Sequence, residues 1–355
     1  MSHPLQGSKP GESTAHLPAL QPSGEVLVTG GCGYIGSHAV RALCEAGYSV
    51  VIFDNLYTGH LEAVMGACDF KLYQGDLRDD KAVESVFKQH KISGVLHFAG
   101  LTLVGESVRD PETYYGANVT GGLNLLAACK RYKVPRFIFS STAAVYGNPQ
   151  NSPITEDHSL RPINPYGRTK LAFEHALESY HDAHGIRFVT LRYFNAAGAH
   201  PSGDMGEAHD PESHLIPNAC RVGLGQLERL TVYGNDYETP DGTGIRDYIH
   251  VWDLAQAHVA ALEYLAAGGE SGAFNVGTGQ GHSVLEVIRA VERASGRSIP
   301  FTVGERRPGD PPRLVADPAR LQASLAFKPA RSDLKTICED AWRWHSNHPH
   351  LYGKP

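Results

Sequence analysis

A glycine-rich turn directly follows a short apolar run near the amino end of the chain. The run Glu25 to Thr29 leads into Gly30, Gly33 and Gly36, which have the spacing GxxGxxG. Glycines at such positions permit a sharp turn, a close approach of backbone N–H groups to a ligand, and tight packing of the next helix on the strand. That helix directs its positive amino end at the turn, which favours a bound phosphate. The pattern therefore predicts a phosphate-binding strand–turn–helix unit.

Further apolar runs alternate with helical patterns as far as about residue 192. Continuous apolar strands between helices are typical of a parallel sheet that is covered on both faces. The fold class predicted is α/β, a Rossmann-like doubly wound parallel sheet. The strand runs are 48–53, 69–73, 94–98, 136–139 and 187–191, and the helical patterns are 37–46, 81–90, 121–132 and 165–184.

The composition and periodicity of the sequence change after residue 192. Glycine, proline, aspartate and histidine crowd residues 200–217 and 234–244 without clear periodicity, which is typical of binding loops. We therefore expect a disordered leader over residues 1–24, a cofactor-binding domain over 25–192 and a smaller, loop-rich substrate domain over 193–355. Part of the last domain, about 245–276, carries a helix and a strand that we expect to return to the sheet.

Composition and charge exclude several classes of protein. The net charge of -6 gives no basic surface for nucleic acid or acidic membranes, and no apolar run is long enough to span a bilayer. The six cysteines lie far apart without a CxxC motif, so we expect free thiols in a reducing, cytoplasmic compartment. No HExxH motif occurs, and the histidines near the carboxyl end, at positions 345, 348 and 350, are expected at the surface. No metal site is predicted.

Asp54 ends the second apolar run and indicates which dinucleotide is bound. A carboxylate at this place accepts hydrogen bonds from an adenosine ribose and repels a 2′-phosphate. The sequence therefore predicts NAD rather than NADP. Asp76, after the third run, is either a second contact at the adenine end or a turn residue.

Tyr166 and Lys170 lie one helical turn apart at the start of a helix that Asn164 and Pro165 begin. An ammonium beside a phenol, with a cationic nicotinamide nearby, lowers the pKa of the phenol and makes it a general base near neutral pH. Thr142 follows the preceding strand, where parallel sheets bind their ligands, and is expected to hydrogen-bond a substrate hydroxyl. These residues predict redox chemistry at a carbinol carbon.

With these motifs the chain resembles the extended short-chain dehydrogenase/reductases, and among them the UDP-glucose 4-epimerases. The resemblance extends from about Val26 to Tyr352. It includes the segments 29–31, 54–56, 97–100, 104–107, 193–195, 198–203 and 233–237, and its most specific stretch is DGTGIRDYIHV at 241–251.

The resemblance implies an isomerase that interconverts UDP-galactose and UDP-glucose with NAD. In that chemistry Tyr166 takes the proton of the sugar 4-hydroxyl beside Thr142, a hydride moves to NAD, and the 4-keto sugar turns over before the hydride returns. It also implies a homodimer. The implied NAD contacts are Gly30, Gly33, Tyr34, Ile35, Gly36, Asp54, Asn55, Asp76, Leu77, Phe98, Ala99, Gly100, Asn118, Tyr166, Lys170 and Tyr193. The implied substrate contacts are Thr142, Asn195, His214, Tyr233, Arg246, Arg307 and Asp310.

Three positions depart from the pattern of that family. Thr102 stands where some members place a lysine against the cofactor phosphates, and His214 stands where others have an asparagine near the sugar. Leu314 replaces a tyrosine or a small residue at the wall that limits N-acetylated sugars, so UDP-GlcNAc and UDP-pentose epimerases stay open as alternatives.

Two other functions fit the sequence less well. Ala143 and Ala144 occupy the places of the acid and base of a 4,6-dehydratase, which disfavours that enzyme. A regulator that senses NAD without catalysis has no need of Tyr166 and Lys170.

Overall fold

The structure is a computed structural model that describes residues 24–307 and 309–353. The leader expected over residues 1–24 therefore lies, apart from Gly24, outside the described residues.

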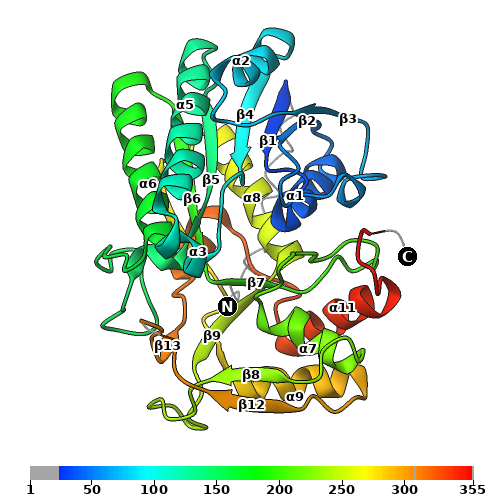
Figure 1. The fold of residues 1–355 in the computed structure, drawn as a ribbon. Helices are drawn as coiled ribbons and strands as arrows, with labels where there is room; N and C mark the ends of the chain where they lie inside the picture. Colours follow the sequence, from blue (N-terminus) through cyan, green and yellow to red (C-terminus); the bar gives the residue numbers. More distant parts are fainter. Residues whose placement is uncertain (1–23, 308, 354–355) are drawn as a thin grey trace, which may run out of the picture.

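A seven-stranded parallel sheet forms the centre of the larger part of the molecule (Figure 1). Its strand order is β10-β6-β5-β4-β1-β2-β3, so the order reverses between β1 and β4. The chain leaves the carboxyl ends of these two paired strands towards opposite faces of the sheet, which opens a site for a ligand there. The strands are β1 (Glu25–Thr29), β2 (Ser49–Asp54), β3 (Phe70–Gln74), β4 (Ile92–His97), β5 (Arg136–Thr142), β6 (Arg187–Tyr193) and β10 (Gly272–Val276).

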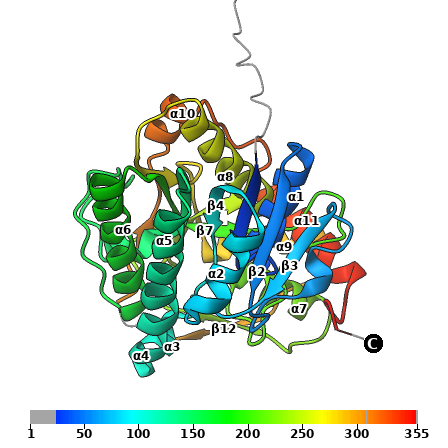
Figure 2. The same cartoon turned by 90° about the horizontal axis from the view of Figure 1, so that it is seen from above.

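Helices cover both faces of this sheet, which confirms the predicted doubly wound fold (Figure 2). One face packs against α1 (Tyr34–Glu45) and α8 (Val251–Ala266). The other packs against α2 (Asp80–Gln89), α5 (Gly121–Arg131) and α6 (Pro165–His184). The short helices α3 (Val104–Arg109) and α4 (Pro111–Tyr115) contact α6.

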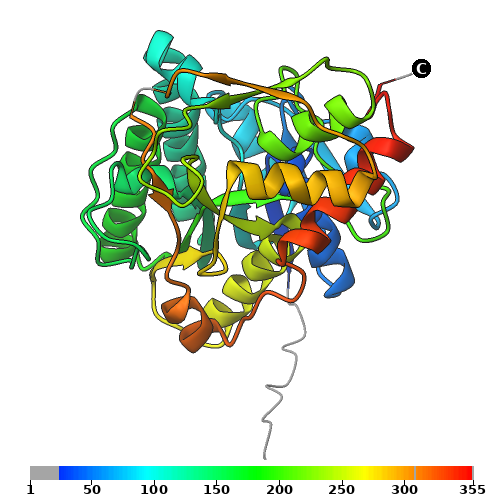
Figure 3. The ribbon, with the colours of Figure 1, turned by 90° about the horizontal axis from the view of Figure 1, so that it is seen from below.

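A second, smaller unit lies beyond the carboxyl ends of the sheet (Figure 3). In it β9 pairs with β7, β11 and β13, and β8 pairs with β12. Its strands are β7 (Asn195–Ala197), β8 (Leu230–Tyr233), β9 (Ile245–His250), β11 (Gly281–Ser283), β12 (Phe301–Gly304) and β13 (Arg313–Leu314). Three helices share its apolar core, namely α7 (Leu215–Gly223), α9 (Val284–Ser295) and α11 (Leu334–Asn347).

The chain returns from this unit to the large sheet as α8 and β10, and α10 (Ala319–Leu325) then packs beside them. The return begins at Val251, because β9 belongs to the smaller unit. The helices α7, α9 and α11 were not predicted from the sequence. For α9 a signal was present, since Ser283 and Glu286 form a capping box at its start.

The structure contradicts two expectations, that all six cysteines are free and that His345 lies at the surface. Cys44 at the end of α1 and Cys68 before β3 form a disulfide with their Cα atoms 5.9 Å apart, while the other four cysteines are free and buried. The fold brings these two cysteines together, and their spacing of 24 residues in the sequence did not indicate a disulfide. His345 is buried within α11 rather than exposed, and burial lowers its pKa to about 4. Within the described chain, no helix has the length and apolar character needed to cross a membrane.

Candidate active site

One long groove runs along the carboxyl ends of the sheet strands and continues between the two units. It is lined by all of the expected site residues except Lys170 and Asn118. The three departures noted in the sequence, Thr102, His214 and Leu314, line it as well. Residues from across the chain therefore meet at one surface.

The glycine turn at the start of the groove has no room for a side chain at Gly30 or Gly36. Gly30 has φ +71, and a Cβ there would lie 2.5 Å from the amide nitrogen of Ala99. A Cβ on Gly36 would collide with the carbonyl oxygen of Gly30. The turn consequently forms an open cradle of backbone N–H groups at the amino end of α1, which suits a diphosphate.

Asp54 holds the glycine turn against the end of β2. Its Oδ2 accepts a hydrogen bond from the Cys32 amide at 2.9 Å, and its Oδ1 accepts one from the Leu56 amide at 2.8 Å. Each carboxylate oxygen has a second lone pair, so the group is able to accept further hydrogen bonds from a ribose diol.

Asp76 pairs with its neighbour Arg78 at 2.7 Å and also accepts the Arg78 amide at 2.8 Å. The hydrogen bond from the Arg78 side chain lowers the pKa of Asp76 to about 2. Asn55 donates weakly to the same carboxylate at 3.4 Å. Asp76 therefore has the local contacts of a turn residue while it lines the groove.

Helix α6 presents Tyr166 to the groove and keeps Lys170 behind it. Asn164 caps the helix by accepting the Gly167 amide at 2.8 Å. The Lys170 ammonium donates to the Ser140 carbonyl at 3.0 Å and lies 5.0 Å above the Phe139 ring. Burial lowers the pKa of Lys170 to about 8.

The environment of Tyr166 differs from the expectation. Burial and the neighbouring Tyr193 raise the pKa of its phenol, while the Thr142 hydroxyl acts in the opposite direction. The predicted lowering included a cationic nicotinamide beside the phenol, and the protein by itself raises the pKa instead. The reason is geometric, because the Lys170 ammonium is directed at the backbone of β5.

Asn118 acts below the surface of the groove. Its side-chain amide donates to the Leu101 carbonyl and to the Thr169 hydroxyl, each at 3.0 Å, and its Oδ1 accepts the Leu101 amide at 2.8 Å. Asn118 thereby fixes the segment after β4, including Gly100, against α6.

Charged side chains gather at the far end of the groove. Arg246 of β9 forms an ion pair with Asp310, and the Arg307 guanidinium lies 4.2 Å from the centre of the Tyr233 ring. Asn195 donates to the Asp247 carbonyl at 3.0 Å. Two guanidinium groups in one groove are suited to the oxygens of a diphosphate.

His214 lies at the rim of the groove in a cluster that the sequence analysis missed. It pairs with Glu207 and Glu212, and His209 lies beside both carboxylates. Burial alone would lower the pKa of His214, but attraction by Glu207 outweighs it and raises the pKa to about 9. The regular spacing ExHxxExH at 207–214 was a signal that the sequence analysis did not use.

Comparison with known proteins gives consistent matches. Residues 26–277 match the NAD dependent epimerase/dehydratase family. UDP-glucose 4-epimerase of Halalkalibacterium halodurans is 49% identical over 92% of this chain and 97% of its own length. The crystal structure of UDP-glucose 4-epimerase from Brucella ovis in complex with NAD is 48% identical with a TM-score of 0.88, covering 93% of this chain and 99% of that one. The enzyme from Bifidobacterium longum in complex with NAD+ and UDP is 42% identical with a TM-score of 0.86, covering 92% and 99%.

Proposed function

The chain belongs to the NAD dependent epimerase/dehydratase family, and we propose that it interconverts UDP-galactose and UDP-glucose with NAD as its cofactor. One observation carries the proposal. The glycine turn, the Tyr166 phenol and two arginines line a single groove. The groove therefore offers a site for a dinucleotide at the glycine turn, for the reacting sugar at Tyr166 and for a second diphosphate at the arginines.

The residues present fit NAD. The side-chain-free cradle of Gly30, Gly33 and Gly36 suits its pyrophosphate, and the Asp54 carboxylate at the end of β2 suits an unphosphorylated ribose. When bound, NAD supplies a reversible hydride acceptor for the carbon that carries the sugar 4-hydroxyl.

The protein contributes proton transfer and position. We assign Tyr166 as the base that takes the proton of the 4-hydroxyl, with the Thr142 hydroxyl beside it as the hydrogen-bonding partner. Lys170 adds positive charge behind the phenol and anchors α6 to β5. Arg246 and Arg307 hold the diphosphate while the 4-keto sugar turns over, so both faces of C4 become available in one pocket.

The groove disfavours the dehydratase alternative. Ala143 and Ala144 line it next to Thr142 and carry no group that exchanges protons. UDP-GlcNAc and UDP-pentoses remain alternative substrates, since Leu314 and His214 line the sugar end of the groove. A sensor without catalysis has no use for the buried Tyr166 and Lys170 pair.

The decisive experiment is a substrate panel with the purified protein. UDP-galactose, UDP-GlcNAc and UDP-xylose are each supplied without an external oxidant, and the epimer formed is measured by chromatography. We expect the highest kcat/KM with UDP-galactose. Tyr166→Phe should retain NAD and lose nearly all activity, whereas Tyr48→Phe, between α1 and β2 and away from the groove, serves as the matched control. Full activity in Tyr166→Phe contradicts the assignment.

We further propose a homodimer. The described surface near α4 and α5 exposes the apolar side chains of Tyr115 and Leu123, which supports an interface through α5 and α6. Sedimentation of the holoenzyme tests the dimer.

A further inference from the structure

A compact set of two glutamates and two histidines lies on the segment between β7 and α7. Glu207, His209, Glu212 and His214 each direct one donor atom inward, and these four atoms all lie within 4.8 Å of one another. The Nδ1 of His209 is 3.0 Å from a Glu207 oxygen and 3.9 Å from a Glu212 oxygen. The Nδ1 of His214 is 3.7 Å from the other oxygen of Glu212.

These separations resemble those around a small tetrahedral ion. Zinc binds imidazole nitrogen and carboxylate oxygen at about 2.0–2.2 Å, which places neighbouring ligand atoms roughly 3.3 Å apart. The four donors are therefore near enough to surround one ion once the wider separations close by up to about 1.5 Å.

The charge of the cluster also suits a cation. The side chains of Glu207 and Glu212 are only 2% and 4% exposed. Among the described residues, histidines alone form ion pairs with these two carboxylates. Glu212 also accepts the amides of Ser213 and His214. Two buried carboxylates side by side need such partners, and a metal ion can take the place of the histidine protons in that role.

We propose that Glu207, His209, Glu212 and His214 bind one divalent transition-metal ion of the zinc type. Two imidazoles with two carboxylates favour zinc over magnesium or calcium, which prefer all-oxygen sites. Four protein ligands leave no open position, so the ion has a structural role. His214 is then a metal ligand, in place of the sugar contact that was expected of it.

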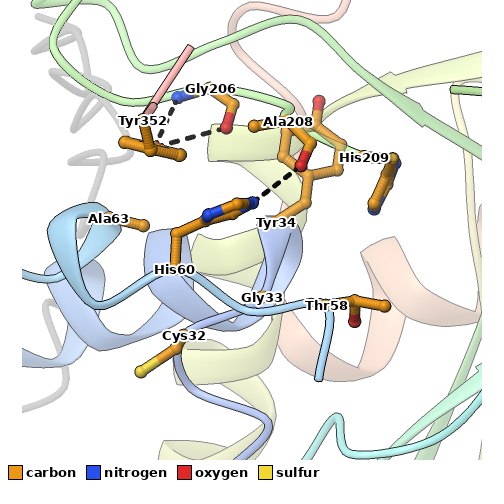
Figure 4. A pocket seen from close by; sticks show the side chains of 10 residues that line it. All are labelled: Cys32, Gly33, Tyr34, Thr58, His60, Ala63, Gly206, Ala208, His209 and Tyr352. Atoms are coloured by element: carbon orange, nitrogen blue, oxygen red, sulfur yellow. Dashed lines mark hydrogen bonds between the residues drawn. The ribbon is translucent and has the colours of Figure 1, made fainter. Parts of the chain in front are cut away.

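The position of the cluster explains what the ion would stabilise. Segment 206–209 borders a small pocket beside the glycine turn, where His60 bonds to the Ala208 carbonyl at 2.9 Å and Tyr352 bonds to Gly206 (Figure 4). The His209 ring also meets the ring of Tyr34, at the start of α1, edge to face with centroids 6.1 Å apart. An ion would fix this segment as one wall of the groove, between the cofactor end and the start of α7. The site does not depend on the proposed reaction.

The test measures metal binding directly in the full-length holoenzyme. The protein is stripped with a chelator, incubated with zinc chloride, separated from free ion, and analysed by mass spectrometry of the metal. We expect one zinc per chain in the wild type and nearly none in His209→Asn/His214→Asn. The control His184→Asn/His350→Asn removes two exposed histidines and should keep one zinc. Cobalt chloride in place of zinc should give the visible absorption of four-coordinate cobalt in the wild type alone.

Further measurements distinguish loss of the metal site from misfolding of the variants. Bound NAD and circular dichroism are compared among all variants, and the milder Glu212→Gln should weaken zinc binding at least tenfold in calorimetry. Zinc should raise the Tm of the wild type but not of the double variant, and millimolar magnesium should not compete. Equal zinc in the wild type and in His209→Asn/His214→Asn, or no zinc in the wild type, overturns the site. An unchanged Tm with stoichiometric zinc overturns its structural role.

Discussion

The Lys170 ammonium donates its hydrogen bond to the carbonyl oxygen of Ser140, 3.0 Å away, and not to the phenol of Tyr166. This contact connects α6 to β5 directly behind the proposed base. Lys170 consequently has two roles in the proposed mechanism, since it supplies charge and also sets the position of Tyr166 relative to Thr142.

Replacing Lys170 by methionine removes the charge and keeps most of the buried volume. We expect kcat to fall on the order of 10²-fold, within the range that acid–base groups contribute, with weaker retention of NAD. Steady-state kinetics and the ratio of bound NAD to protein measure both effects. Lys335→Met, at a largely exposed position on α11, is the control, and equal kcat in the two variants would contradict the role of Lys170.

Glu174 and Arg192 form an ion pair at 2.6 Å in which both side chains are buried, and Ser141 donates to the same glutamate at 2.5 Å. Glu174→Gln leaves the Arg192 guanidinium without its counter-charge, so the free energy of unfolding should fall by about 3–5 kcal/mol. Urea unfolding followed by circular dichroism measures it. Glu339→Gln breaks the exposed pair with Lys335 on α11 and should cost less than about 1 kcal/mol. Similar losses for both variants would contradict the importance of burial.

Gly36→Ala places a methyl group against the Gly30 carbonyl and should open the glycine turn. We expect the purified variant to contain little NAD and to require a large excess of added NAD for activity. Gly272→Ala in β10 is the control, because a Cβ there meets no atom within 4 Å. Normal NAD content in Gly36→Ala would show that this turn does not hold the cofactor.

Burial lowers the pKa of His258 from 6.5 to about 4. Between these values the unfolded chain binds a proton that the folded chain does not, so stability rises with pH in this window and is lost as the pH falls from about 6.5 towards 4. His258→Phe should reduce the slope of unfolding free energy against pH by about 1.4 kcal/mol per pH unit. Urea melts at half-unit pH steps measure the slope. Met65→Leu changes an exposed side chain without a titratable group and should leave the slope unaltered, and an unchanged slope in His258→Phe would refute the assignment.

Leu314 of β13 lines the groove at the end that we propose binds the sugar. Leu314→Ala should raise kcat/KM for UDP-GlcNAc relative to UDP-glucose by about tenfold or more, since one methylene group in a pocket already contributes about tenfold. Leu314→Tyr should shift the ratio in the opposite direction. Ratios that are the same in all three proteins would remove Leu314 as the wall that selects the sugar.

Local sequence was sufficient for the sheet and for the residues that act within one strand–turn–helix unit. The apolar runs and their glycine, asparagine and proline boundaries predicted β1 and the start of α6 to the residue, because these features depend on near neighbours in the chain. The placement of Gly30, Asp54 and Tyr166 in one groove followed from the rule that parallel strands end at the same edge.

Tertiary structure alone decided the remaining features. The pairing of Arg246 with Asp310 and the Cys44–Cys68 disulfide depend on segments far apart in sequence, whose proximity no local pattern encodes. The pKa values of the site residues also depend on how deeply the fold buries them. Tyr166 and Lys170 are one helical turn apart as expected, yet the phenol pKa is raised, because desolvation by the surrounding fold outweighs any effect of the nearby ammonium.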